Sequence, residues 1–142
     1  MTMTVVRLLA DDLTGALDTA AEFVGLCGPF DVTWADSPAA PGAQSLAIDS
    51  GTRERSKADS VEIVGRLAPQ LQGGTIAYKK VDSLLRGAWA AELGACLRGG
   101  DWASCVVAQA FAIRDAAPSA ASNSRALYRV TGIASATTCW TN

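Results

Sequence analysis

Three groups of charged and hydroxyl-bearing side chains in this 142-residue chain could bind a small, very polar molecule. The groups are Asp11 with Asp12, Arg53, and residues 80–83. Arginine and lysine pair with carboxylates, and arginine can do so through two parallel hydrogen bonds. Carboxylate and hydroxyl oxygens are good partners for sugar hydroxyls. Together, the groups suit a compound that carries one carboxylate and several hydroxyls.

Each residue of these groups matches part of such a compound. Arg53 and Lys80 suit its carboxylate, whereas Asp12, Asp82 and Ser83 suit its hydroxyls. If one hydroxyl is to attack phosphorus, a carboxylate beside it must orient it or accept its proton. Asp12 and Asp82 both fit that task. The sequence does not choose between them, so the catalytic residue stays unassigned.

The acidic pair and the arginine also have structural alternatives. Asp12 is of a preferred type for capping the helix that follows it, and Asp11 could do so in its place. Arg53 could instead pair on the surface with a nearby acid, Glu54 or Asp59.

The third group has similar alternatives. Lys79 and Lys80 are neighbours at the end of an expected strand, so their side chains point to opposite faces and only one of them is expected to enter the site. Arg86 could pair with Glu92 rather than contact a ligand.

Short apolar runs alternate with helix-like segments along most of the chain. The expected strands are residues 5–10, 30–34, 45–48, 75–78 and 103–108, and the expected helices are residues 16–26, 56–71 and 89–97. This alternation predicts an α/β fold, a three-layer Rossmann-like domain with a mainly parallel sheet. In such folds, ligands bind beyond the carboxyl ends of the strands. The three polar groups follow the first, third and fourth strands, so we expect them to meet at one edge.

The first expected helix repeats apolar residues at helical spacing. Leu17, Ala20, Ala21 and Val24 share one of its faces. We expect that face to pack against the sheet.

Composition argues against several kinds of partner. The net charge is −2, and lysine and arginine form no runs, so nucleic-acid binding is not expected. No apolar stretch approaches the ~20 residues of a membrane span. The N-terminus lacks the basic-then-apolar pattern of a secretion signal. We therefore expect a cytoplasmic protein that binds neither nucleic acid nor membrane.

Four cysteines and no histidine limit the chemistry further. The cysteines are Cys27, Cys96, Cys105 and Cys139, and no two of them form a C-x-x-C pair. Neither a structural zinc site nor a disulfide is expected from this pattern. Without histidine, the chain has no Ser-His or Cys-His catalytic pair.

Two common phosphate-binding patterns are missing from the sequence. It contains no G-x-x-x-x-G-K-[ST], and no G-x-G-x-x-G follows the first expected strand. We expect no ATP site in this chain.

Three segments together resemble one known family. They are residues 10–16 (ADDLTGA), 49–53 (DSGTR) and 78–87 (YKKVDSLLRG). Over residues 5–111 the chain is similar to the sugar-binding N-terminal domain of the four-carbon acid sugar kinases, which use ATP and Mg²⁺ to phosphorylate compounds such as threonate, erythronate and 3-oxo-tetronate. The resemblance implies sugar-acid contacts by Asp12, Arg53, Lys80, Val81, Asp82 and Ser83, with Asp11 and Arg86 as further candidates.

The resemblance stops after Phe111. The family continues with proline and a Gly-Arg element and carries a second, ATP-binding domain, whereas here residues 112–116 read AIRDA. We expect residues 1–111 to form a partial sugar-acid-binding domain, incomplete at its C-terminus, and residues 112–142 to form an irregular tail with one short strand at 127–130. We hypothesise a shifted reading frame, because plausible GC-rich codons read one base later give Pro-Ser-Gly-Thr-Arg.

A chain truncated in this way is expected to bind no ATP or Mg²⁺ and to be inactive alone. It would need a separate ATP-binding domain as its partner, because phosphoryl transfer requires the γ-phosphate in line with the attacking hydroxyl.

Two other interpretations stay open from the sequence. One is a phosphoacceptor receiver domain in signalling, with Asp11, Asp12 and Asp49 around a magnesium ion. Against it, the lysine of that pattern should follow the fifth strand, and here the lysines follow the fourth. The other is a remnant with no function.

Overall fold

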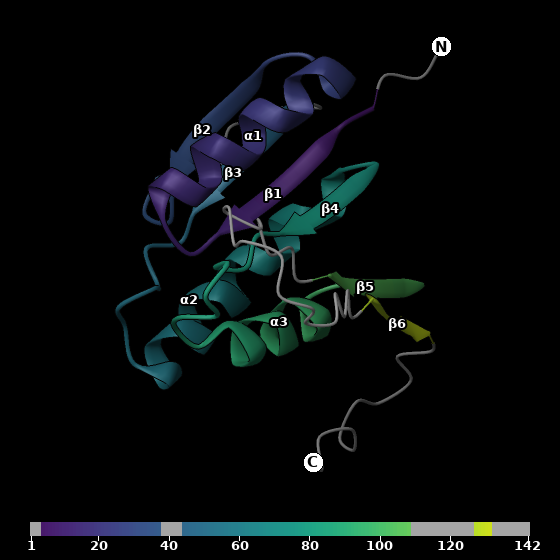
Figure 1. Ribbon diagram of the computed structural model, residues 1–142. Coiled ribbons are helices and arrows are strands. Elements are labelled where there is room, and N and C mark those ends of the chain that lie inside the picture. Colours follow the sequence, from purple (N-terminus) through teal and green to yellow (C-terminus); the bar gives the residue numbers. More distant parts are fainter. Residues whose placement is uncertain (1–3, 38–43, 109–126, 132–142) are drawn as a thin grey trace, which may run out of the picture. The chain divides into compact units, whose positions relative to one another are not determined.

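The computed structural model describes residues 4–37, 44–108 and 127–131, which fall into two compact units, Met1–Asp101 and Trp102–Asn142 (Figure 1). The expected change of character after Phe111 lies outside the described residues.

The first unit is a parallel α/β sheet with helices. Its elements are β1 (Val6–Ala10), α1 (Leu13–Cys27), β2 (Phe30–Trp34), β3 (Ser45–Asp49), α2 (Lys57–Leu67), the 3₁₀ helix η1 (Ala68–Gly73), β4 (Ile76–Lys79) and α3 (Trp89–Arg98). The strands lie in the order β2-β3-β1-β4, and every pairing is parallel. Helix α1 packs on β1 and β3, whereas α2, η1 and α3 pack together on the other side (Figure 1). The predicted three-layer, mainly parallel α/β fold is confirmed.

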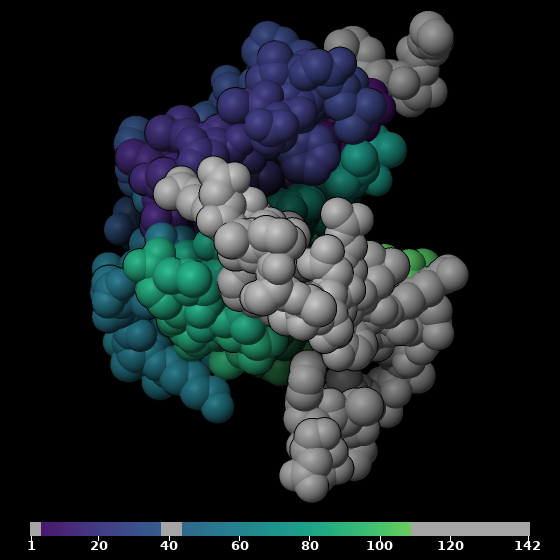
Figure 2. All heavy atoms as spheres, in the orientation of Figure 1, coloured from purple at the N-terminus to yellow at the C-terminus, as the bar shows by residue number. Residues whose placement is uncertain are grey.

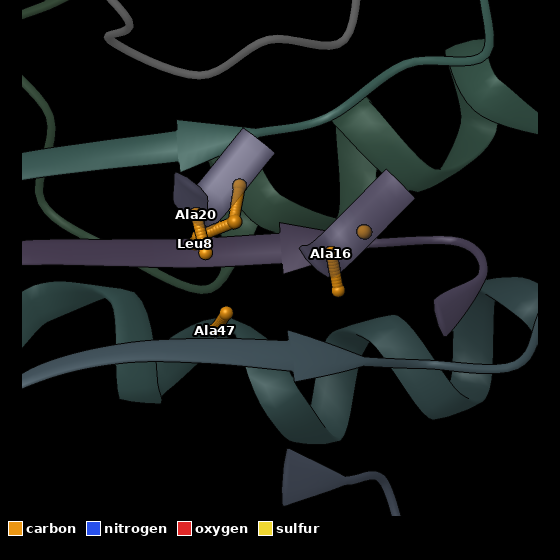
Figure 3. Close-up of a cluster of buried hydrophobic side chains, with 5 residues drawn as sticks. Leu8, Ala16, Ala20 and Ala47 are labelled. Carbon is orange, nitrogen blue, oxygen red and sulfur yellow. The ribbon is translucent and has the colours of Figure 1, made fainter. Parts of the chain in front are cut away.

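The strand β1 is the centre of the core. Its residues from Leu8 to Ala10 are fully buried, as expected of a central strand covered on both faces. Leu8 and Ala47 meet Ala16 and Ala20 of α1, so small side chains allow the helix to lie close to the sheet (Figure 3).

The predicted packing face of α1 is correct at Ala20 and wrong at its other three residues. The buried residues of the helix are Ala16, Thr19, Ala20 and Cys27. Leu17 and Val24 are 47% and 46% exposed, and Figure 2 shows α1 at the surface of the first unit. The helix has apolar residues on two faces, and the face with the smaller side chains is the one that fits against the sheet.

The expected helix 56–71 is two elements. Ser56 begins α2 by accepting a hydrogen bond from the amide of Asp59, and the α-helix ends at Leu67. Pro69 follows at the start of η1, where it has no amide hydrogen to continue the α-helical pattern.

The second unit contains β5 (Ser104–Ala108) paired antiparallel with β6 (Leu127–Thr131). Both segments were expected as strands. The expectation that residues 103–108 would join the parallel sheet is wrong, because β5 lies in a separate two-stranded sheet. None of the described helices combines the length and apolar character of a membrane span.

Two glycines allow a matched test of the packing around β1. A Cβ at Gly74 would lie 2.8 Å from Cγ of Arg7 and 2.9 Å from the carbonyl oxygen of Ile76, whereas a Cβ at Gly65 in α2 would meet nothing within 4 Å. We expect Gly74→Ala to lower the free energy of unfolding by about 1–3 kcal/mol through overpacking. Gly65→Ala should raise it by about 0.5–1 kcal/mol. Urea unfolding measures both, and equal stability of the two variants would contradict the packing described here.

Candidate functional site

Arg53 lies among three carboxylates that come from two parts of the chain, the adjacent Asp11 and Asp12 and the distant Asp82. Its Nε and Nη2 donate to the two carboxylate oxygens of Asp11, at 3.1 and 2.9 Å. Its Nη1 donates to Oδ2 of Asp12 at 2.6 Å. Nη2 also lies 3.4 Å from Oδ1 of Asp82. The structure thus brings together these four predicted residues, and their role in binding a substrate stays a prediction.

The segment before Arg53 is tied to the end of β1 by hydrogen bonds. The amides of Thr52 and Arg53 donate to the carbonyl oxygen of Asp11, at 3.0 and 3.2 Å. The amide and hydroxyl of Ser50 donate to the carbonyl oxygen of Ala10, at 2.9 and 2.8 Å. Ser50 and Thr52 also share a hydrogen bond between their buried hydroxyls. These bonds fix Arg53 beside the acidic pair.

Asp12 caps α1 and also binds Arg53. Its Oδ1 accepts the amide of Gly15 at 2.8 Å, while Oδ2 accepts from Arg53. The capping role is therefore confirmed for Asp12 rather than Asp11, and it does not exclude a second role. The alternative pairing of Arg53 with Glu54 or Asp59 is wrong, because its partners are the carboxylates of the cluster.

Asp82 organises the turn that follows β4. Its Oδ2 accepts the amides of Leu84 and Arg86, at 3.2 and 3.1 Å. The Arg86 side chain adds a two-point contact, from Nε to Oδ2 at 2.9 Å and from Nη2 to Oδ1 at 3.0 Å. The predicted alternative partner of Arg86, Glu92, is therefore wrong. Asp82 is buried and surrounded by donors.

The two adjacent lysines point to opposite sides of the sheet, as expected. Nζ of Lys79 lies 2.8 Å from Oε2 of Glu92 on α3. Lys80 lies on the α1 side, since a Cβ at Gly15 would be 3.5 Å from its Cγ. Its Nζ donates to the carbonyl oxygen of Val81 at 2.7 Å. Of the other predicted contacts, Val81 is half-buried and Ser83 is exposed.

Hydrogen bonds within the cluster shift the pKa values of three of its residues, Arg53, Asp82 and Arg86. Hydrogen bonds from Arg86 hold the pKa of Asp82 well below its ordinary value of 3.8, against the opposite effect of burial, and Arg53 adds to the lowering. The hydrogen bond to Asp11 raises the pKa of Arg53. The bond to Asp82 raises the pKa of Arg86 in the same way. Asp11, Asp12 and Asp82 are thus paired with Arg53, and Asp82 has a second counter-ion in Arg86.

The geometry does not favour a magnesium-dependent receiver site. Both oxygens of Asp11 are engaged by Arg53, and Oδ1 of Asp49 accepts the amide of Gly51 at 2.8 Å. Within the described ranges, no group of three or more acidic, cysteine or histidine side chains is placed to hold a metal ion.

Comparison with known proteins gives concordant matches. The family described as the sugar-binding N-terminal domain matches residues 6–126. A D-threonate kinase from Bordetella bronchiseptica is 38% identical over 117 residues, which cover 76% of this chain and 29% of that protein.

Solved structures also match the chain. Two crystal structures of a domain of unknown function from Bordetella bronchiseptica, each described as a domain-swapped dimer with bound citrate, are similar to it. One has a TM-score of 0.52 at 33% identity and covers 66% of this chain and 25% of its own. The other has a TM-score of 0.54 at 31% identity and covers 69% and 27%. The present chain spans less than a third of the length of these relatives.

Loss of the central arginine should destabilise the fold. In Arg53→Met, the buried carboxylates of Asp11 and Asp82 lose their shared counter-ion, and breaking a buried pair in this way costs about 3–5 kcal/mol. The matched control is Arg55→Met, because the Arg55 side chain is exposed and donates to the carbonyl oxygen of Gly51 rather than to a carboxylate. It should change stability by about 0.5 kcal/mol or less. Chemical unfolding at pH 7 gives both values, and similar losses in the two variants would show that Arg53 is not the counter-ion of the cluster.

Acid should weaken the cluster through Asp82. Its folded pKa is depressed, so its stabilising contribution is complete above the unfolded pKa, near 3.8, and is lost as the pH falls below that value. The loss approaches about 1.4 kcal/mol per pH unit. We expect the difference in stability between the wild type and Asp82→Asn to be constant from pH 7 to about pH 4.5 and to shrink below pH 3.8. Thermal unfolding over this range tests it. A difference that stays constant down to pH 2.5 would contradict the depressed pKa.

Proposed function

Because the chain belongs to the sugar-binding N-terminal domain family of the four-carbon acid sugar kinases, we propose that it binds a four-carbon sugar acid of the threonate type at the cluster around Arg53. One observation carries this proposal. Residues from three separate segments meet within hydrogen-bonding distance where parallel strands end, and ligands of such sheets bind at that edge.

The carboxylate of the sugar acid would be bound chiefly by Lys80 and Arg86. Arg53 suited this role from its type alone, but its side chain is 15% exposed and its donors serve Asp11 and Asp12. Lys80 donates one hydrogen bond among the described residues, and an ammonium group has three donors. Arg86 is 55% exposed, which leaves part of its guanidinium accessible. Arg53 would then hold the carboxylates in place.

The hydroxyls of the sugar acid would be bound by Asp12 and Ser83. The Asp12 side chain is 29% exposed, whereas that of Asp82 is 6% exposed and accepts several hydrogen bonds. Asp12 is therefore the better candidate to orient an attacking hydroxyl. Citrate in the related crystal structures supports this reading, because it is also a small hydroxy acid.

Two observations support placing the nucleotide elsewhere. The sequence has no phosphate-binding loop of the common types, and the carboxylates of Asp11, Asp12 and Asp82 are engaged by Arg53 and Arg86. We therefore propose that a separate domain or chain binds the nucleotide and that this chain alone binds the sugar acid without phosphorylating it.

Isothermal titration of the purified chain with D-threonate tests the proposal. We expect saturable binding of D-threonate and no binding of threitol, which lacks the carboxylate. Lys80→Met should weaken binding about ten-fold or more, since it removes a charge-assisted hydrogen bond. Lys57→Met, at an exposed lysine that begins α2, is the matched control and should bind as the wild type does.

Three outcomes would count against parts of the proposal. A folded, monodisperse chain that does not bind D-threonate would refute the site. Phosphorylated product on addition of ATP and Mg²⁺ would refute the assignment of the nucleotide to another domain or chain. A chain that cannot be obtained folded would favour a remnant without function.

A further inference from the structure

We propose that the buried ion pair between Lys79 and Glu92 is a positioning device, which holds the turn after β4 in the shape that the sugar-acid site needs. The pair itself has no place in the proposed contacts with the sugar acid. The effect of the ion pair on the turn can be measured without a ligand. The inference therefore rests on the proposed function only where it concerns binding of the sugar acid.

The pair joins the two elements between which this turn runs. Lys79 is the last residue of β4, and Glu92 lies in the first turn of α3. Their side chains are 5% and 1% exposed, with Nζ and Oε2 2.8 Å apart. Residues 80–88, which carry the candidate side chains, belong to no helix or strand. The ion pair therefore closes the base of an irregular segment.

Stability alone is a poor reason for this pair. Two charges lose hydration when they are buried, and apolar side chains of similar volume often stabilise a core as well or better. Both carboxylate oxygens of Glu92 are buried and neither has a hydrogen-bond partner among the described residues, so the contact with Lys79 is an ion pair without hydrogen-bond geometry and the carboxylate is not fully compensated. A buried contact that costs this much is better explained by the geometry that it imposes.

The pair acts on the site through the backbone of the neighbouring lysine. Nζ of Lys79 donates to the carbonyl oxygen of Lys80 at 3.1 Å, and the amide of Lys80 donates to Leu9 of β1 at 2.8 Å. The backbone of Lys80 is therefore held at both its amide and its carbonyl group. Because successive side chains alternate, anchoring Lys79 on the α3 side directs Lys80 to the α1 side.

The other end of the turn is close to Arg53. Gly87 has a φ of 76°, and a Cβ there would lie 3.1 Å from the carbonyl oxygen of Arg53. Between the two ends, Asp82 approaches Arg53 at 3.4 Å. A small displacement at the base of the turn would therefore disturb both Lys80 and the Asp82–Arg53 contact.

The test is hydrogen–deuterium exchange on a double variant, Lys79→Met/Glu92→Leu. It removes both charges and keeps much of the volume, so the fold should survive. We expect the amides of Leu84 and Arg86, which bind Asp82, to exchange about ten-fold faster or more, while the amides of β1 keep their protection. The affinity for D-threonate should fall by about ten-fold or more in the same variant.

A surface ion pair of the same unit is the matched control. Arg66 and Asp36 lie 3.7 Å apart with side chains 60% and 96% exposed. Arg66→Gln/Asp36→Asn should leave both the exchange of the turn and the affinity unchanged.

The outcomes separate the two proposals. A folded double variant with wild-type exchange in the turn and wild-type affinity would overturn the positioning role. If the wild type does not bind D-threonate, the proposed function fails, and the exchange rates alone still decide the role of the pair. If the double variant does not fold, Glu92→Gln, which keeps the shape and removes one charge, decides it by the same exchange measurement.

Discussion

The neutralisation of buried carboxylates by Arg53 is the constraint on which the carboxyl edge of this sheet depends. Asp11 and Asp82 are 3% and 5% exposed, and each would be costly to keep charged without a counter-ion nearby. Arg53 reaches both, together with Asp12, and thereby joins the end of β1 to the turn after β4. The chain between Asp49 and Arg53 must therefore stay beside the end of β1, and its hydrogen bonds to β1 hold it there.

The hydrogen bonds inside the cluster have a consequence for its choice of ligand. An acid that binds there needs cationic donors that the cluster does not already engage. Lys80 and Arg86 keep such donors at the rim, whereas the donors of Arg53 serve the carboxylates of the cluster. A neutral sugar would gain nothing from these two cations. The cations at the rim of the cluster would therefore give the preference for an acid. The ion pairs at its centre would keep the side chains of the site in place.

The sequence predicts the layers of this fold better than its pairings. Buried apolar runs and helical periodicity are local signals, so the strands of the sheet and the meeting of the polar groups at one edge were predictable. The packing face of α1 was not, because both of its faces carry apolar residues and the choice depends on closeness to β1. Pairing of β5 with β6, and of Arg86 with Asp82 rather than Glu92, depends on partners that local patterns do not identify.

In the third segment of the family resemblance, residues 78–87, several positions have separate physical tasks. Lys79 must point inward to Glu92, and its neighbour must point toward α1. Asp82 must accept the amides of its own turn and still face Arg53. Gly87 must combine a positive φ with close approach to the backbone of Arg53, which a side chain would obstruct. These requirements are independent of one another, so a substitution at any of these positions would disturb the turn in its own way.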